Sequence, residues 1–338
     1  RPLRPALPGV ESARVFTLRT VEDTLRLHTF IQCSAPRSAV VVGGGFIGLE
    51  MMENLTHQGI QVTVVEKQRQ VMAPIDYDMA CGVHAYLRDK GVALRLDAAV
   101  EGFEETDSSL SVRLEGGERL ESDMVVLAPG VVPDTGLAKE AGLTLGGRGA
   151  IVVNDRMETS APDIYAVGDA VQITHAVTGD PAWVPLAGPA NKQGRIAADN
   201  ISGRDSRFDG SQGTSILRVF DMTVAATGLN ERAAEAAGYR FDKVVTFSPS
   251  HATYYPGASS MNINSVIERD SGRILGAQIV GFEGADKRID VLAAAVRGQM
   301  GAADLAELEL AYAPPFSSAK DPVNMAGFVI GNLLDGTV

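Results

Sequence analysis

Three glycines with the spacing G-x-G-x-x-G are residues whose type and spacing suit one particular chemistry. They are Gly43, Gly45 and Gly48, with Phe46 and Ile47 between the last two. The first glycine can adopt the backbone angles of a sharp turn, and the second leaves room for a pyrophosphate against the main chain. The third lets a helix pack closely on the preceding strand, and the helix N-terminus offers N–H groups to phosphate. The spacing therefore predicts that these five residues bind a dinucleotide.

An acidic residue, Glu66, follows the glycines at the end of a β-branched run. A carboxylate in this place accepts hydrogen bonds from both hydroxyls of the adenosine ribose, and it repels a 2′-phosphate. We therefore predict NADH as the dinucleotide. Lys67 and Arg69 lie close enough in the sequence to receive a 2′-phosphate, so NADPH is the less favoured alternative.

The segments around the glycines are those that a dinucleotide-binding unit needs. An apolar run over 39–42 predicts a buried strand, and an amphipathic segment over 49–55 predicts a helix. A second β-branched run over 61–65 predicts the next strand, which ends at the acid. Strand, turn, helix and strand in this order predict a βαβ unit, and hence an α/β fold with a parallel sheet.

Two further apolar runs predict strands whose carboxyl ends bear candidate ligand-binding residues. The run over 123–128 ends at Gly130, and the run over 163–167 is followed by Asp169. Ligands of open α/β sheets bind at the carboxyl ends of the strands. Asp169 either caps the segment that follows it or accepts a hydrogen bond from a ligand hydroxyl, and its position alone leaves both readings open.

A helix is predicted over 185–200, because Pro189 is suited to a first helical turn. Its start, formed by Pro185, Leu186 and Ala187, presents a second positive helix end to a ligand.

Composition limits the classes of protein to which this chain can belong. It has 338 residues, 45% of them hydrophobic, and a net charge of −12. The length predicts two or three domains, and the negative charge argues against nucleic acid and anionic membrane surfaces as partners. Apolar runs stay well short of the roughly 20 residues of a membrane span. The two cysteines, Cys33 and Cys81, form no CxxC pair; we interpret them as small buried hydrophobes in a protein of the reducing cytoplasm. No metal site is expected.

The chain changes character at a polar, glycine-rich linker over 203–213. The residues beyond it predict strands followed by helices, which is typical of an α+β domain. At the other end, residues 1–38 are interpreted as a proline-containing connector with one helix over 21–33. Because the sequence opens without an initiator methionine, we interpret it as a piece of a longer polypeptide.

The order of these segments resembles the flavin-dependent pyridine nucleotide–disulfide oxidoreductases. The matching motifs are the glycine turn with its acid, the strand that ends in Ala128-Pro-Gly130, TSAPDIYAVGDA at 159–170, and the terminal α+β domain. Within that family, HATYYPGA at 251–258, AYAPPFSSAKDPVNMAGF at 311–328 and the PLAGPANKQGR stretch resemble the branch of the CoA-disulfide reductases and CoA-dependent NADH persulfide (polysulfide) reductases. Chains of that branch often carry a rhodanese domain further on.

The resemblance implies a division of the chain into domains. Residues 38–155 would form a Rossmann-like NAD(H)-binding domain. Residues 1–37, a connector, and 156–210 would belong to part of a second, FAD-binding domain. Residues 213–336 would form the α+β dimerisation domain of a homodimer.

The resemblance also implies roles for particular residues. Asp169 would bond the ribitol of FAD, and the helix that starts after Pro185 would aim its N-terminus at the flavin pyrimidine. Tyr254 and Tyr312 match two tyrosines that reach across the dimer towards the thiol site, where a phenol could donate a proton to a leaving thiolate. Without the family, either tyrosine reads as an ordinary half-buried aromatic side chain.

The sequence also departs from the family pattern. No second G-x-G-x-x-G precedes position 34, and neither Cys33 nor Cys81 takes the place of the family's redox cysteine. Pro129 also removes a backbone donor beside Gly130. We therefore expect the C-terminal two-thirds of an NADH- and FAD-dependent reductase of a CoA-disulfide, CoA-persulfide or polysulfide. The alternatives are an NADH oxidase or peroxidase of the same family and, for the isolated chain, a non-catalytic NAD(H)-binding dimerisation module that does not retain FAD tightly.

Overall fold

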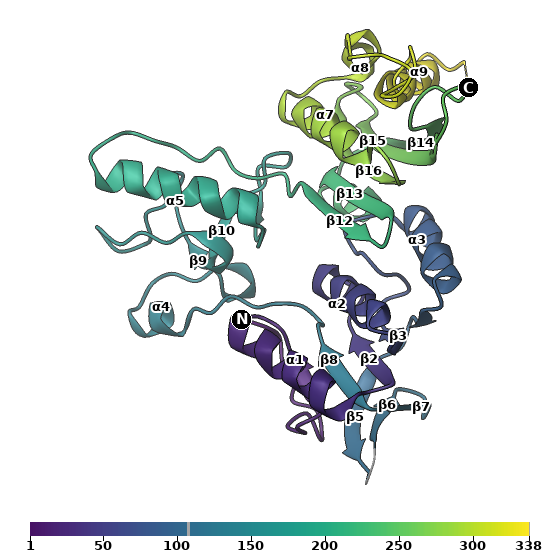
Figure 1. Ribbon diagram of the computed structural model, residues 1–338. Coiled ribbons are helices and arrows are strands. Elements are labelled where there is room, and N and C mark those ends of the chain that lie inside the picture. Colours follow the sequence, from purple (N-terminus) through teal and green to yellow (C-terminus); the bar gives the residue numbers. More distant parts are fainter. Residues whose placement is uncertain (107–108, 338) are drawn as a thin grey trace. The chain divides into compact units, whose positions relative to one another are not determined.

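The computed structural model describes residues 1–106 and 109–337 (Figure 1). The chain forms two compact units. The first consists of residues 1–131 together with 218–221, and the second of residues 132–217 together with those from 222 onwards. Each unit has its own hydrophobic core.

A wholly parallel sheet organises the first unit, in the strand order β1-β8-β2-β3-β4. The strands are β1 (Val15–Thr17), β8 (Met124–Leu127), β2 (Ser38–Val42), β3 (Gln61–Val65) and β4 (Ala93–Arg95). Every residue of β8 is buried, as expected for a central strand covered on both faces. Helix α2 (Phe46–His57) connects β2 to β3 and buries Leu49, Met52 and Leu55. The predicted βαβ unit is therefore confirmed.

The N-terminal residues contribute more to this unit than a connector with one helix. The predicted helix is confirmed as α1 (Val21–Ser34), which begins at a capping box between Thr20 and Asp23. Before it, β1 forms the edge of the parallel sheet beside β8. The sequence does not predict β1, because a strand of three residues is too short to carry a periodic pattern.

The rest of the first unit is a helix and a small antiparallel sheet, in the order β5-β6-β7. The elements are α3 (Tyr77–Asp89), β5 (Val100–Glu105), β6 (Leu110–Leu114) and β7 (Arg119–Ser122). Leu110, Val112 and Leu114 are buried and join the core formed with Val40 and Val125 of the parallel sheet.

The second unit begins with short elements around a long helix. They are α4 (Gly136–Glu140), β9 (Ile151–Val152), β10 (Val171–Thr174), β11 (Pro181–Ala182) and α5 (Ala187–Ile201). Helix α5 confirms the helix predicted over 185–200, with Pro189 in its first turn. It buries Gln193, Ala197 and Asn200.

The strand predicted over 163–167 is wrong. Tyr165 makes an isolated bridge to Glu158, and Asp163 has a φ of 61°. Ile164 and Val167 are 43% and 40% exposed. An apolar run forms a buried strand only where neighbouring strands pair with it. Here the pairing is limited to a single bridge, so no strand forms.

A five-stranded sheet and its helices form the rest of the second unit, in the strand order β12-β13-β16-β15-β14. The strands are β12 (Ser215–Val219), β13 (Met222–Gly228), β14 (Phe241–Pro249), β15 (Ser260–Glu268) and β16 (Ile274–Gly281). The helices are α6 (Glu231–Ala236), α7 (Ala285–Arg297), α8 (Ala302–Glu307) and α9 (Pro322–Leu334). The pairs of β16 with β13 and β15, and of β15 with β14, are antiparallel. Figure 1 shows α7, α8 and α9 near this sheet, so the predicted α+β domain is confirmed.

Among the residues that the structure describes, no helix combines the length and apolar character needed to cross a membrane.

Candidate functional site

The glycine turn follows β2 and is closed by close backbone contacts. Gly43 has a φ of +110°, and its N–H donates to the Val65 carbonyl at 2.8 Å. A Cβ at Gly43 would lie 2.2 Å from the Ala128 carbonyl oxygen, and one at Gly48 would lie 1.9 Å from the Gly43 carbonyl oxygen. A side chain at either position would therefore displace the backbone, so both glycines are required for the turn to form.

Gly45 has a different environment, and it marks the place where a ligand can approach. A Cβ built on Gly45 would meet no atom of the described residues within 4 Å. The same residue is the N-cap of α2, and no side chain in the described part of the chain caps that helix end. The N–H groups of the first turn, which includes Phe46 and Ile47, therefore face an open surface suited to a pyrophosphate.

Glu66 lies against the glycine turn, at the end of β3. One carboxylate oxygen accepts the Gly44 N–H at 2.7 Å, and the other accepts the Gln68 N–H at 2.8 Å. A carboxylate oxygen accepts more than one hydrogen bond, so both oxygens retain capacity for ribose hydroxyls. The structure thus brings together the predicted acid and the predicted turn, and the pair fits a dinucleotide.

The other residues predicted for the dinucleotide site lie near the glycine turn. Gly130 follows β8 and has a φ of +132°. Its neighbour Pro129 lies against the glycine turn, since a Cβ built on Gly43 would lie 3.0 Å from the Pro129 Cα. The guanidinium of Arg69 stacks over the Tyr77 ring at 4.3 Å. Lys67 is exposed.

Asp169 lies in a short turn that is tied to α5. Gly168, with a φ of +84°, donates its N–H to the Gln193 side chain of α5 at 2.7 Å. The Trp183 indole Nε1 donates to the Asp169 carbonyl oxygen at 2.7 Å. The Asp169 residue is exposed, so its carboxylate can be reached by a ligand.

The first turn of α5 carries the other residues predicted for the flavin. Leu186 is the N-cap, and within the described residues no side chain caps this helix end. Pro185 and Ala187 flank it. The uncapped N–H groups give this helix end a positive potential, which fits an electron-rich ring atom.

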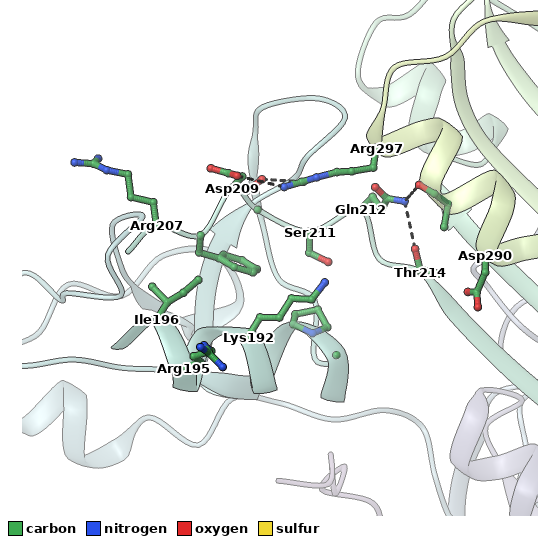
Figure 2. A pocket seen from close by; sticks show the side chains of 15 residues that line it. Lys192, Arg195, Ile196, Arg207, Asp209, Ser211, Gln212, Thr214, Asp290 and Arg297 are labelled. Atoms are coloured by element: carbon green, nitrogen blue, oxygen red, sulfur yellow. Dashed lines mark hydrogen bonds and ion pairs between the residues drawn. The ribbon is translucent and has the colours of Figure 1, made fainter. Parts of the chain in front are cut away.

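A cavity of about 570 Å³ opens beside α5, a size typical of small-molecule sites. Figure 2 shows Lys192 extending from α5 towards Ser211, and Arg297 of α7 reaching Asp209. The Arg297 guanidinium donates to the Asp209 carbonyl oxygen at 3.1 Å. Asp169 does not line this cavity, and neither do residues 185–187. The structure therefore does not bring these predicted flavin ligands into the cavity.

The two predicted tyrosines meet in the second unit. Tyr254 follows β14 and Tyr312 follows α8, yet their hydroxyl oxygens lie 3.1 Å apart. The side chains are 75% and 48% exposed. The hydrogen bond to Tyr312 raises the pKa of Tyr254 above its ordinary value, and partial burial adds to the effect. Tyr254 therefore keeps its proton at neutral pH, and the pair can donate a hydrogen bond to an anion.

Sequence reasoning missed Arg288, a buried side chain close to the tyrosine-bearing segments. It lies in α7 and is 1% exposed. The buried face of this helix also contains Ala285, Ile289 and Leu292. A charged residue in register with an apolar helix face was the signal that could have identified it, because such residues are rarely buried without a specific partner.

The interpretation of the cysteines as buried is wrong, because both Cys33 and Cys81 are exposed. Cys33 lies in the last turn of α1. In α3 the buried residues include Ala80, Val83 and Leu87, and Cys81 points away from that face.

Comparisons with known proteins match most of the chain to one family. Residues 1–194 match the pyridine nucleotide-disulphide oxidoreductase family, and residues 214–322 match the dimerisation domain of that family. A coenzyme A disulfide reductase of Staphylococcus aureus (strain JH9) is 34% identical over 321 residues, which cover 95% of this chain and 72% of that protein.

Two solved structures have a similar fold along the entire chain. The reduced CoADR-RHD of Bacillus anthracis has a TM-score of 0.97 and 48% identity, over 100% of this chain and 61% of that one. An NAD-dependent persulfide reductase from A. fulgidus has a TM-score of 0.96 and 40% identity, over 99% and 62% respectively. The chain thus spans about three-fifths of the length of these two proteins. It belongs to the family of pyridine nucleotide-disulphide oxidoreductases.

Proposed function

We propose that this chain is part of an enzyme that reduces a CoA-linked disulfide, persulfide or polysulfide with NADH, through FAD. The observation that carries the proposal is the tyrosine pair, because Tyr254 and Tyr312 come from distant segments and place their hydroxyls 3.1 Å apart. The names of the relatives, a coenzyme A disulfide reductase and an NAD-dependent persulfide reductase, support the substrate class.

The electron donor would bind at the glycine turn. Gly45 and the first turn of α2 would hold the pyrophosphate, and Glu66 would accept the ribose hydroxyls. Gly130, at the end of β8, would lie beside the nicotinamide half. We propose NADH over NADPH because the Glu66 carboxylate would repel a 2′-phosphate.

FAD would bind at the Asp169 turn and the start of α5. When bound, FAD supplies a carrier that accepts two electrons from NADH and delivers them to sulfur. Asp169 would accept a ribitol hydroxyl, and the N–H groups that follow Pro185 and Leu186 would stabilise negative charge on the ring. The domain organisation that we propose is 38–155 for NADH, 1–37 with 156–210 for FAD, and 213–336 for dimerisation.

The tyrosine pair would act on the sulfur substrate. Cleavage of a sulfur–sulfur bond by two electrons yields two thiolates, which must take up protons. One phenol donates to the other, and the remaining O–H can then donate to a leaving thiolate. We propose that the pair is completed by a second copy of the chain. The exposure of Tyr254, Tyr312 and the neighbouring Phe316 supports a surface that a partner covers.

The test is the double variant Tyr254→Phe/Tyr312→Phe in the full-length flavoprotein. We expect kcat for release of CoA thiol from CoA-disulfide to fall about 100-fold, in the range of general acid catalysis. Anaerobic reduction of the flavin by NADH should be unchanged, because neither tyrosine belongs to the glycine turn. Tyr255→Phe is the matched control. Unchanged release of thiol in the double variant would refute the proposed role.

A further inference from the structure

A buried ion pair lies beneath the two tyrosine-bearing segments. The Arg288 guanidinium of α7 donates to the Asp321 carboxylate, with Nη2–Oδ2 at 2.9 Å and Nε–Oδ2 at 3.2 Å. Asp321 is also the N-cap of α9, where it accepts the Val323 N–H at 3.0 Å. Arg288 is 1% exposed and Asp321 is 2% exposed. Burial of charge is unfavourable unless the partners are well placed, so the geometry of this pair is tightly constrained.

The same guanidinium reaches the backbone of both segments. Its Nη2 donates to the Ser250 carbonyl oxygen at 2.9 Å and to the Phe316 carbonyl oxygen at 3.3 Å. Ser250 immediately precedes the segment of Tyr254, and Phe316 lies four residues after Tyr312. One planar side chain therefore holds the start of one segment and the end of the other, as the fixed fork of arginine donors allows.

One more hydrogen bond joins the segments directly. The Ala252 N–H donates to the Ser317 carbonyl oxygen at 3.1 Å. The Ser317 hydroxyl donates to Asp321 at 2.6 Å and also lies 3.2 Å from Nη2 of Arg288. The tyrosine side chains themselves are largely exposed, so their positions depend on the backbone that carries them.

We propose that Arg288 is a positioning residue for the tyrosine pair. By holding Ser250, Phe316 and Asp321 at once, it keeps the hydroxyls of Tyr254 and Tyr312 within hydrogen-bond distance. If Arg288 were merely structural, any buried side chain of suitable volume could replace it. A positioning role instead requires the forked N–H donors of the guanidinium. Only the expected change in kcat rests on the proposed function of the tyrosine pair; the expected change in the ionisation of Tyr254 does not.

The test is Arg288→Lys in the full-length flavoprotein, because lysine keeps the charge and loses the fork. The first measurement is the ionisation of Tyr254, followed in the ultraviolet and isolated by difference against Tyr254→Phe. We expect its pKa to fall towards the ordinary value of about 10, because the hydrogen bond to Tyr312 is lost. The second is turnover: kcat for thiol release should fall about tenfold, while KM for NADH and anaerobic flavin reduction stay unchanged.

The control is Arg269→Lys in the same domain, since Arg269 pairs with Asp242 at the surface and lines no part of the cavity beside α5. It should change neither measurement. If Arg288→Lys fails to fold, Ser317→Ala serves instead, because it removes a single hydroxyl from the network and should shift the Tyr254 ionisation in the same direction.

The outcomes separate the two ideas. A folded Arg288→Lys protein with unchanged Tyr254 ionisation and unchanged kcat would overturn the positioning role. A shifted ionisation, together with full activity of the Tyr254→Phe/Tyr312→Phe variant, would support positioning by Arg288 and refute the proposed function of the pair.

Discussion

The glycine turn and the tyrosine pair are specified in opposite ways. At the turn, Gly43, Gly45 and Gly48 are close in sequence. Two of these positions, 43 and 48, must be glycine, because a Cβ there would lie within 2.2 Å of a backbone oxygen. The tyrosines are 58 positions apart, and a buried side chain from a third segment, Arg288, holds the backbone beneath them. Local spacing therefore encodes the first site, and tertiary contacts encode the second. Substitutions can test this difference.

The largest effect is expected for Gly48→Ala. Its Cβ would lie 1.9 Å from the Gly43 carbonyl oxygen, so the helix must move away from the turn. We expect the free energy of unfolding to fall by about 3 kcal/mol and NADH binding to be lost, as measured by urea unfolding and titration calorimetry. Gly45→Ala adds the same methyl group to an open surface, so it should retain stability and bind NADH about tenfold more weakly. Equal stability of the two variants would contradict the packing argument.

The next effect concerns Asp321. Burial opposes its ionisation, but hydrogen bonds from Arg288, Ser317 and the Val323 N–H outweigh burial and hold its pKa below the ordinary value. A depressed pKa contributes stability above the unfolded-state pKa of about 4, and this contribution disappears as pH falls through the folded-state pKa.

We therefore expect Asp321→Asn to reduce the free energy of unfolding by about 3 kcal/mol at pH 7. The difference from the parent should shrink below pH about 4. Urea unfolding across pH 3 to 8 measures it, with Asp304→Asn as a surface control at the start of α8. A difference that does not vary with pH would show that charge at Asp321 is not what stabilises the segments.

A smaller effect is expected for Glu66→Gln. The amide can no longer attract two hydroxyls as a carboxylate does, so NADH should bind about tenfold more weakly, which corresponds to about 1.4 kcal/mol. Binding of NADPH should change less or improve, because the repulsion of the 2′-phosphate is removed. Titration calorimetry with both dinucleotides measures the ratio, and Glu50→Gln on the exposed side of α2 is the control. An unchanged ratio of the two affinities would show that Glu66 does not determine the preference for NADH.

The smallest effect concerns His84, which supports the loop beside the turn. The Val71 N–H donates to Nε2 of His84 at 3.2 Å, and burial, aided by the charge of Arg88, lowers the pKa of His84. The unfolded chain therefore binds the proton more readily, and stability falls as pH drops below about 6.5.

In His84→Gln the amide oxygen can still accept the Val71 N–H, so the fall in stability between pH 7 and 5 should become smaller. It should not vanish, because burial also lowers the pKa of His175. Thermal unfolding at several pH values measures the fall, with His28→Gln on an exposed face of α1 as the control. If the stability of the parent and that of His84→Gln changed equally with pH, His84 would be excluded as a source of the pH dependence.

The same contrast explains how much the sequence could predict. Elements with their own caps and period were predicted, as α1 shows with its capping box between Thr20 and Asp23. Strand β1 was missed because its identity as a strand comes from pairing with β8. The run over 163–167 has the composition of a strand but only an isolated bridge to Glu158. In both cases the partner, rather than the segment, decides the structure.

The candidate site divides along the same line. The glycine turn and Glu66 were predicted from spacing, and the structure brings them together. Tyr254 and Tyr312 were singled out through resemblance alone, since nothing in their local sequence implies that they meet. Arg288 was missed because its partners, Ser250 and Asp321, come from segments far apart in the chain. Physical reasoning from sequence identifies sites whose geometry the backbone specifies locally, and it fails where buried side chains supply the geometry.

Trp183 offers a direct optical view of one of these sites. It is the single tryptophan of the chain, and its indole donates to the Asp169 carbonyl oxygen at 2.7 Å. Tryptophan emission from these 338 residues therefore originates beside the turn proposed to bind FAD. Any ligand that settles there and absorbs in the near ultraviolet or blue should quench that emission, so the fluorescence of the unmodified chain can report occupancy of this turn without an added label.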